Sequence, residues 1–209
     1  MVKENSFFAK SAIALVLGMF VTVGQADVWE VDGSHSNVGF TIKHMMVSKV
    51  KGTFKDFKGA FNIDEKDMGK STAETTVETT SINTDNGDRD KHLRSADFFD
   101  VAKFPKMTFK SKKWEGESKD AKLKGELTLH GVTKEVTLNV TELTAAVKDP
   151  FGGTRRGLSA NTKLNRKDFG LIWNKSMDAG GLVLGEDVDV TIELELMKPK
   201  APAKKSAKS

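Results

Sequence analysis

The sequence predicts an all-β protein, because three observations agree. Apolar and polar residues alternate with a period of two along most of the chain between residues 27 and 197, which is typical of strands with one dry and one wet face. The alternating segments, about eight to ten of them, follow one another so closely that most must pair as antiparallel neighbours. Only one short segment breaks the period. A single small helix cannot cover a sheet, so the sheet must cover its own apolar face as a barrel or a sandwich.

The first 26 residues are predicted to be a cleaved signal peptide. Lys3 and Lys10 precede an uncharged run over residues 11–23, which ends in the small-residue segment 24–26 (GQA). This order of charged, apolar and small residues is that of a secretory signal. The run of 13 residues is shorter than the roughly 20 that a membrane-spanning helix needs. We therefore expect a mature chain that begins at Asp27 and a periplasmic or secreted location.

The strands are predicted from apolar residues that stand two positions apart. The pattern is clearest over residues 188–196, where valine, isoleucine and leucine alternate with acidic residues and threonine. The earlier strands, in chain order, contain Val38, Phe40 and Ile42; Phe61 and Ile63; residues 73–79; Met107 and Phe109; Leu123, Leu127 and Leu129; Val136, Leu138 and Val140; and residues 158–164.

Two connections between these strands can also be predicted. Residues 130–135 lie between two alternating segments and predict a hairpin. Residues 86–99 break the period of two and predict a short helix followed by a turn.

The last twelve residues, 198–209, are predicted to be a disordered tail. They consist of lysine, alanine, proline and serine, without an aromatic or branched apolar residue, so they cannot bury enough surface to become ordered. The lysines can give the tail a weak attraction to anionic membrane surfaces, at about 1 kcal/mol each near such a surface. The alternative is a solubilising extension that has no partner.

The charge of the chain argues against a nucleic-acid partner. The whole chain has 33 basic and 29 acidic residues. Without the two lysines and one glutamate of the signal segment and the five lysines of the tail, residues 27–197 keep 26 basic and 28 acidic residues, a net charge of −2. Proteins that bind phosphate backbones carry a strong basic excess. We expect no nucleic-acid partner.

No catalytic or metal-binding constellation is predicted. The four histidines, His35, His44, His92 and His130, show neither H-x-H nor H-E-x-x-H spacing, and they are interpreted as hydrogen-bonded or exposed. The chain has no cysteine, so it has no disulfide, thiol nucleophile or thiolate ligand. The carboxylates Asp88, Asp90 and Asp168 are explained by helix capping and ion pairs. We expect no catalytic residue, no metal and no cofactor.

The interior of the expected barrel is predicted to be apolar. A barrel of eight strands is either just filled by side chains or just able to hold one small ligand. The chain has 13 phenylalanines and 3 tryptophans but no tyrosine, so rings that face a cavity bring no phenolic hydroxyl into it.

At several segments the chain resembles the YceI-like polyisoprenoid-binding family. The similar segments are residues 32–44 (DGSHSNVGFTIKH), 50–59 (VKGTFKDFKG), 81–84 (SINT), 89–101 (RDKHLRSADFFDV) with Phe104 and Pro105, 125–134 (GELTLHGVTK), 164–170 (LNRKDFG) and 185–188 (GEDV). The resemblance extends over essentially the whole mature body. One position departs from the pattern: Phe151 stands where the family is expected to have tryptophan, and the exchange of one ring for another changes little.

This resemblance implies a fold and a ligand class. It implies an eight-stranded antiparallel, lipocalin-like barrel with one short helix, often paired as a homodimer, exported in bacteria and holding a polyisoprenoid or similar apolar amphiphile in its lumen. The sequence leaves open whether the cargo is a prenyl pyrophosphate, a quinone or a fatty amide, because one methylene changes binding in a pocket by only about 1–3 kcal/mol.

The residues expected to line the lumen are ring-bearing, aliphatic or flexible apolar side chains in or beside these family-like segments. Methionine is included because its unbranched side chain can repack around an irregular ligand. Residues 89–99 are expected to close or line the entrance, with Arg89 and Arg94 on polar partners. The predicted ligand contacts are Phe40, Ile42, Met45, Met46, Leu93, Phe98, Phe99, Phe169 and Trp173.

A basic cluster beside these segments is a candidate for head-group contacts. Arg155, Arg156 and Arg166 carry guanidinium groups, which suit phosphate or carboxylate. The alternative is that these arginines pair with neighbouring acids.

Three functions remain after the sequence analysis. The favoured one is an exported carrier of an isoprenoid or other lipid, for transport, storage or stress protection. The alternatives are an exported enzyme that acts on a small substrate at the barrel mouth, and a barrel packed solid that acts as a ligand-free envelope stress protein.

Overall fold

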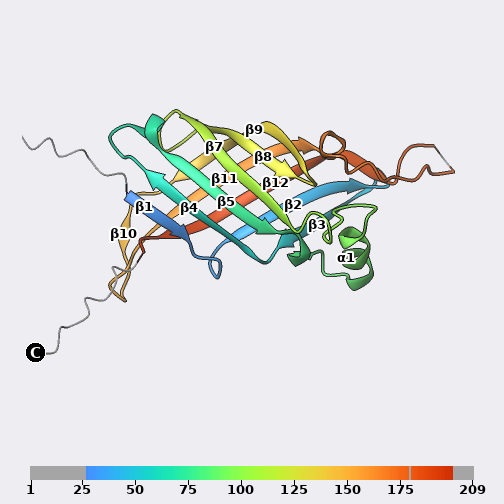
Figure 1. Ribbon diagram of the computed structural model, residues 1–209, viewed down its shortest axis with the longest axis horizontal. Helices are drawn as coiled ribbons and strands as arrows, with labels where there is room; N and C mark the ends of the chain where they lie inside the picture. The colour runs from blue at the N-terminus through green and yellow to red at the C-terminus, as the bar shows by residue number, and fades with distance from the viewer. Residues whose placement is uncertain (1–26, 179, 200–209) are drawn as a thin grey trace, which may run out of the picture.

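Eight long antiparallel strands close into a barrel in the computed structural model, which describes residues 27–178 and 180–199 (Figure 1). The strands are β1 (Asp27–Val31), β2 (Asn37–His44), β3 (Ser48–Phe54), β4 (Phe57–Ile63), β5 (Thr72–Glu78), β6 (Ile82–Asn83), β7 (Lys106–Glu115), β8 (Ala121–Leu129), β9 (Val132–Leu143), β10 (Val147–Lys148), β11 (Thr154–Asn165) and β12 (Leu184–Met197). The helices are α1 (Gly87–Arg94) and the 3-10 helices η1 (Met68–Lys70), η2 (Thr79–Ser81) and η3 (Arg166–Phe169).

Six of the twelve strand segments combine in pairs into longer, interrupted strands. β1 and β2 both lie antiparallel to β12, β4 and β3 continue the sheet beside them, and β5 and β6 follow on the next side. The remaining long strands are β7, β8, β9, β11 and β12, and the pairing of β11 with β12 closes the ring. This up-and-down order confirms the predicted all-β barrel of eight strands with one short helix.

One end of the barrel is packed solid. Six buried side chains, each at most 4% exposed, fill the end that carries β1 and β10, at the left in Figure 1. None of them borders the cavity described below. They are Trp29, Ile63, Trp114, Ala121, Leu143 and Leu196.

The burial along β12 shows that the other end is hollow. Asp187, Asp189 and Thr191 are exposed on the outer face, as the alternation predicts. On the inner face Leu194 and Leu196 are buried, whereas residues 188, 190 and 192 are only half-buried although they face inward. The interior therefore changes from close packing to open space along a single strand.

The predicted connections are largely confirmed. The helix α1 falls within residues 86–99 and is capped by Asn86, whose side chain accepts a hydrogen bond from the backbone N–H of Arg89 at 2.9 Å. The expected hairpin loop over 130–135 is shorter than predicted. Its turn consists of His130 and Gly131, both at positive φ, and β9 already begins at Val132.

The two ends of the chain lie largely outside the described residues. The predicted signal segment 1–26 and residues 200–209 of the predicted tail are not described. The tail boundary at residue 198 needs a correction, because Lys198 is held against the barrel. Its backbone N–H donates to the Thr154 carbonyl at 3.0 Å, and its Nζ lies 2.7 Å from Asp27 Oδ2. Among the described helices, none has the length and apolar character needed to cross a membrane.

Candidate ligand-binding site

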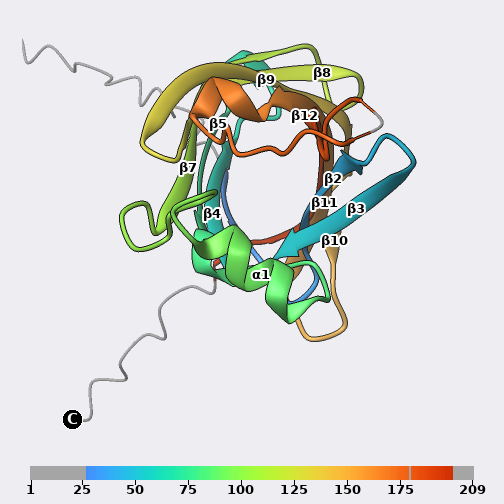
Figure 2. The same ribbon diagram turned by 90° about the vertical axis from the view of Figure 1, so that its right-hand side faces the viewer.

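The hollow half of the barrel holds a cavity of about 360 Å³. All eight long strands contribute apolar side chains to its wall, and the view along the barrel shows the ring of strands with α1 lying across one side of it (Figure 2). The polar side chains that border the cavity are a small minority: His44, Lys58, Thr75, Arg89, His92, Thr162 and Arg166. Such a wall suits an apolar molecule.

The helix α1 is fixed to the barrel by polar contacts, of which those of Asp90 are buried. The carboxylate of Asp90 accepts hydrogen bonds from the backbone N–H of Thr84 at 2.9 Å and from its hydroxyl at 2.6 Å. Arg89 donates to the hydroxyl and the carbonyl of the same threonine, both at 2.7 Å. Arg94 donates to the carbonyls of Thr80 and Ile82. The interpretation of Asp90 as a capping or ion-paired acid is thus wrong, since its partner is a threonine.

Aromatic contacts join α1 to the segment between η3 and β12. The His92 ring packs edge-on against Phe98 and Trp173, with centroids 5.0 Å apart in both cases. Phe98 and Trp173 also contact each other at 5.1 Å. On the other side of the helix, Phe99 packs edge-on against Phe54 at 5.7 Å. These rings border the cavity at the α1 end.

A glycine sets the position of one wall ring. A Cβ atom on Gly52 would come within 2.4 Å of the Phe40 ring, so only glycine lets this ring lie across β3. Phe40 then borders the cavity and packs against Phe54 at 5.9 Å.

Arg166 places a buried positive charge beside the cavity. The residue is 5% exposed, and its Nε donates to the Gly185 carbonyl at 2.8 Å and its Nη1 to the Leu171 carbonyl. Its Nη2 is buried without a hydrogen-bond partner, a condition shared among the described residues only with Nε1 of Trp29. Burial lowers the pKa of this guanidinium, while Glu186 opposes the change. An arginine stays charged in proteins, and no described carboxylate lies within 4 Å of this one.

The structure brings most of the predicted ligand contacts together. The residues in the cavity wall are Phe40, Ile42, Leu93, Phe98, Phe99, Phe169 and Trp173. Met45 and Met46 do not belong to the wall, which corrects the expectation for them. They form the exposed turn between β2 and β3, because the strand ends at His44 and the alternation that points side chains inward ends with it.

The three arginines of the expected basic cluster lie at opposite ends of the barrel. Only Arg166 borders the cavity. Arg155 and Arg156 stand at the start of β11, beside the solid end, where they pair with acids and carbonyl groups. The head-group expectation is therefore wrong for these two residues, and the alternative of pairing with neighbouring acids holds for them.

Comparison with known proteins agrees with this geometry. The profile of the YceI-like domain matches residues 29–196. The chain belongs to the YceI-like family. It is 42% identical to Protein YceI of Escherichia coli O17:K52:H18 over 81% of this chain and 85% of that protein. It is 40% identical to a UPF0312 protein of Enterobacter sp. (strain 638) over 92% of this chain and 99% of the other.

Solved structures share the barrel. A YceI protein of Campylobacter jejuni is 34% identical, with a TM-score of 0.65 over 81% of this chain and 97% of that one. A polyisoprenoid-binding domain from Saccharophagus degradans, described as implicated in plant cell wall breakdown, is 19% identical, with a TM-score of 0.61 over 84% of this chain and all of that domain. The second likeness shows the fold alone.

Two of the YceI-like segments singled out from the sequence lie together at the hollow end. Residues 89–101 form α1 and the turn after it, and residues 164–170 hold Arg166 and Phe169. The sequence analysis missed His44 and His92 as wall residues and did not assign the inward faces of β11 and β12 to the cavity. The alternation that predicted β11 and β12 as strands could also have identified their inward faces. His92 is hydrogen-bonded, as interpreted, with Nε2 2.9 Å from Asp97 Oδ2.

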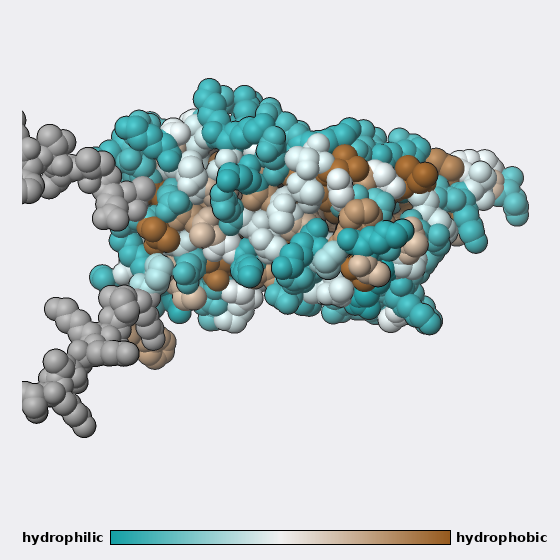
Figure 3. All heavy atoms as spheres, in the orientation of Figure 1, coloured by the Kyte–Doolittle hydropathy of each residue, from teal (hydrophilic) through white to brown (hydrophobic). Residues whose placement is uncertain are grey.

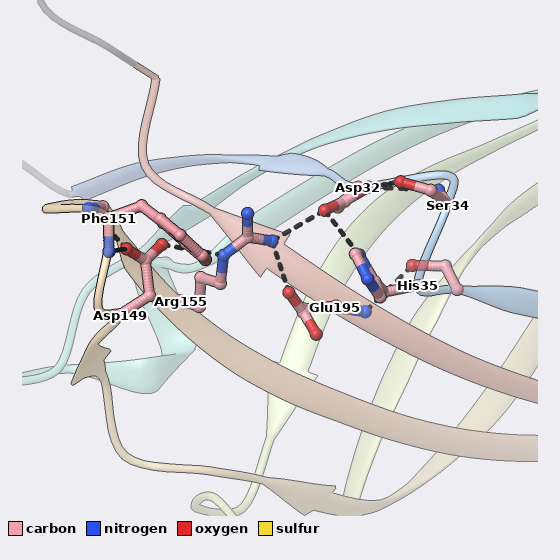
Figure 4. A network of polar contacts seen from close by, with 9 residues as sticks. Asp32, Ser34, His35, Asp149, Phe151, Arg155 and Glu195 are labelled. Atoms are coloured by element: carbon pink, nitrogen blue, oxygen red, sulfur yellow. Dashed lines mark hydrogen bonds and ion pairs between the residues drawn. The ribbon is translucent and has the colours of Figure 1, made fainter.

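A polar network ties strands together at the solid end of the YceI-like barrel (Figure 4). Arg155 Nε donates to Asp149 Oδ2 at 2.9 Å, and Nη1 donates to Asp32 Oδ2 at 2.6 Å and to Glu195. His35 Nδ1 lies 3.0 Å from Asp32 Oδ2. Asp32, His35 and Glu195 offer three possible metal ligands within 4.8 Å of one another. The guanidinium already bridges the two carboxylates, so the cluster is explained as an ion-pair network.

This network perturbs the titration of its members. Hydrogen bonds from Ser34, Arg155 and His35 hold the pKa of Asp32 well below its usual range. The hydrogen bond to Asp32 raises the pKa of His35. Since Asp32 is ionised more easily in the folded state, it contributes stability above its ordinary pKa of about 4, and this contribution is lost as the pH falls below that value. Since the pKa of His35 is raised in the folded state, its protonated ring contributes stability below its ordinary pKa of about 6.5, and this contribution is lost as the pH rises above that value.

We predict that Asp32→Asn weakens the pH dependence of stability on the acid side. The variant should melt several degrees below the wild type at pH 5.5, and the difference should shrink as the pH falls from about 4 toward 2. Melting followed by circular dichroism over this range measures it, with Asp187→Asn on the exposed face of β12 as the control. A difference that stays constant down to pH 2 would contradict the role of the Asp32 charge.

Proposed function

We propose that this chain is an exported binding protein that holds a polyisoprenoid or similar long-chain amphiphile in the lumen of its barrel. The observation that carries the proposal is the cavity of about 360 Å³, walled by apolar side chains from all eight long strands, packed solid at one end and bounded by α1 at the other. Transfer of apolar groups out of water is worth about 0.8 kcal/mol per CH₂. A long chain therefore gains affinity from length alone.

The lumen offers little for catalysis. Among the described residues that border the cavity, there is no aspartate or glutamate, and the titratable groups are His44, Lys58, Arg89, His92 and Arg166. Nucleophilic catalysis needs an activated nucleophile beside its base, and among the described residues that border the cavity there is no serine or cysteine. We therefore propose a binding protein and not an enzyme. The open cavity also counts against a barrel packed solid.

The likeness to the polyisoprenoid-binding domain of Saccharophagus degradans is consistent with this ligand class, although it extends to the fold only. Among apolar chains, the buried Arg166 favours those with an oxygen-bearing head group. A buried cation without a carboxylate partner is stabilised by a phosphate, carboxylate or carbonyl oxygen nearby.

The role of chain burial is tested by a prenyl series of increasing length. Affinity should rise with length until the lumen is full and should change little with salt. Ala160, which is buried in the wall at the middle of β11, provides a matched pair of variants with its outward-facing neighbour Asn161. Ala160→Phe should lower the affinity for the longest chains by about tenfold or more and shift the optimum to shorter ones, whereas Asn161→Phe should bind as the wild type does.

Both variants are checked for folding by circular dichroism before titration with fluorescent prenyl analogues. Equal affinity for all chain lengths, or an affinity that collapses in high salt, would mean a surface site and would end the carrier proposal.

The role of Arg166 is tested by the head group. We expect the wild type to prefer a prenyl pyrophosphate to the prenyl alcohol of the same length. Arg166→Met should reduce this preference by about tenfold, since a hydrogen bond to a charged group contributes about 1.5–3 kcal/mol, and Arg166→Lys should retain part of it. A preference ratio that is the same in all three proteins would exclude Arg166 as a head-group determinant.

Export is proposed from residues 1–26, whose charged, apolar and small-residue segments match a secretory signal. When the gene is expressed in a bacterial host, the periplasmic or secreted protein should begin at Asp27. N-terminal sequencing of that fraction measures this. A chain that still starts at Met1 would refute export by cleavage.

A further inference from the structure

The turn between β2 and β3 exposes three apolar residues in a row. Met45 is 44% exposed, Met46 64% and Val47 86%. They stand at the hollow end of the barrel, next to His44, which borders the cavity. None of the three is in the cavity wall, so the ligand site does not account for them.

The backbone of this turn is poorly suited to methionine. Met45 has a φ of 51° and Met46 a φ of 62°, and the N–H of Val47 donates to the His44 carbonyl at 3.2 Å. Tight hairpin turns with two central residues at positive φ favour asparagine and glycine, because side chains with a normal Cβ are strained there. Asparagine at position 45 and glycine at position 46 would fit this backbone with less strain. The two methionines add exposed apolar surface where the backbone itself disfavours them.

Two more exposed apolar residues lie on the neighbouring segment. The Met45 N–H donates to the Val183 carbonyl at 2.7 Å, which holds the turn against the end of the segment that connects η3 to β12. In that segment Ile172 is 69% exposed and Leu182 is 36% exposed. We call Met45, Met46, Val47, Ile172 and Leu182 the apolar rim. Figure 3 shows apolar surface toward this end of the molecule, at the right of the view.

Lysines flank the apolar rim without acidic partners. Lys43 on β2 stands directly opposite Lys49 on β3, and both are exposed, as are Lys51 and Lys175. None of these four has a carboxylate within 4 Å in the described part of the chain. Like charges placed directly opposite on a sheet are destabilising. The lysine pair, like the two methionines of the turn, therefore adds no stability to the isolated fold.

We propose that the apolar rim and its lysines dock the open end of the barrel onto an anionic lipid membrane. Apolar side chains at a protein tip enter the boundary between head groups and acyl chains, while lysines beside them are attracted to anionic head groups. A second copy of the chain is a poorer partner, because pairing the same surface with itself would bring the unpaired lysines together. An anionic membrane accounts for both features, because it would cover the exposed methionines and neutralise the charge of the lysines.

Vesicle co-sedimentation tests the proposal. The probes are vesicles of phosphatidylcholine alone and vesicles with about one quarter phosphatidylglycerol. The chain from Asp27 to Ser209 should bind the anionic vesicles, and more weakly as salt is raised. Met45→Asn combined with Met46→Gly should reduce binding by about tenfold or more while the melting temperature stays equal or rises. Lys43→Glu combined with Lys49→Ala should abolish the preference for anionic vesicles.

The controls carry the same kinds of change at the solid end. Phe151→Ser removes a ring that is 93% exposed, and Lys122→Glu reverses a charge at the start of β8. Both should bind vesicles as the wild type does. All proteins keep residues 198–209, so any lysine-tail contribution is the same throughout.

Two results would overturn the proposal. One is vesicle binding that is absent, or equal in the wild type and in both rim variants. The other is a wild type that is dimeric by light scattering, becomes monomeric on Met45→Asn with Met46→Gly, and binds no vesicles, which would make the rim an interface between copies. A fluorescent apolar probe measures the lumen separately, so loss of the carrier function and loss of membrane docking are distinguishable.

Discussion

The structure depends on the closure of the sheet between β11 and β12. Eleven residue pairs join these two strands, from Arg155 with Met197 to Asn165 with Asp187. Because the ring is closed, most of the long strands are paired on both sides, and alternate side chains are directed into one interior. Residues 48–52 of β3 pair on one side alone, with β2. The apolar wall, the solid end and the hollow end all follow from this constraint. Within this closed sheet, the amino-acid sequence determines the size of each inward side chain.

Side-chain size divides the interior into a plug and a lumen. Trp29 and Trp114 are almost completely buried at one end, whereas Ala160 and Thr162 border open space nearer the other. Close packing is the normal condition of a protein interior, so a barrel that leaves part of its interior empty gives up contacts that larger residues could have made. The charged groups follow the same division. Arg155 is surrounded by three acids at the plug, while Arg166 stands beside the lumen without one.

The sequence predicted the fold and seven of the side chains that border the cavity, because both depend on local pattern. Alternation identified the inward faces, and the break at residues 86–99 identified α1. The alternation does not indicate where along the barrel axis a residue lies. Arg155 and Arg166 are close in sequence, but both stand at the ends of one extended strand, and at about 3.3 Å per residue a strand of that length crosses the barrel. Met45 and Met46 were misplaced for a related reason: nothing in the alternation indicates the residue at which a strand gives way to its turn.

The contact between Lys198 and Asp27 has a practical consequence for handling the protein. The two ends of the barrel domain lie within one ion pair, at 2.7 Å, on the side of the molecule opposite to α1. A peptide tag, a fluorescent fusion or a tether to a chip can therefore be attached at either end, and the α1 end of the barrel then faces the solution. Joining the two ends and opening the chain elsewhere would require only a short linker, so new termini could be moved to a chosen loop.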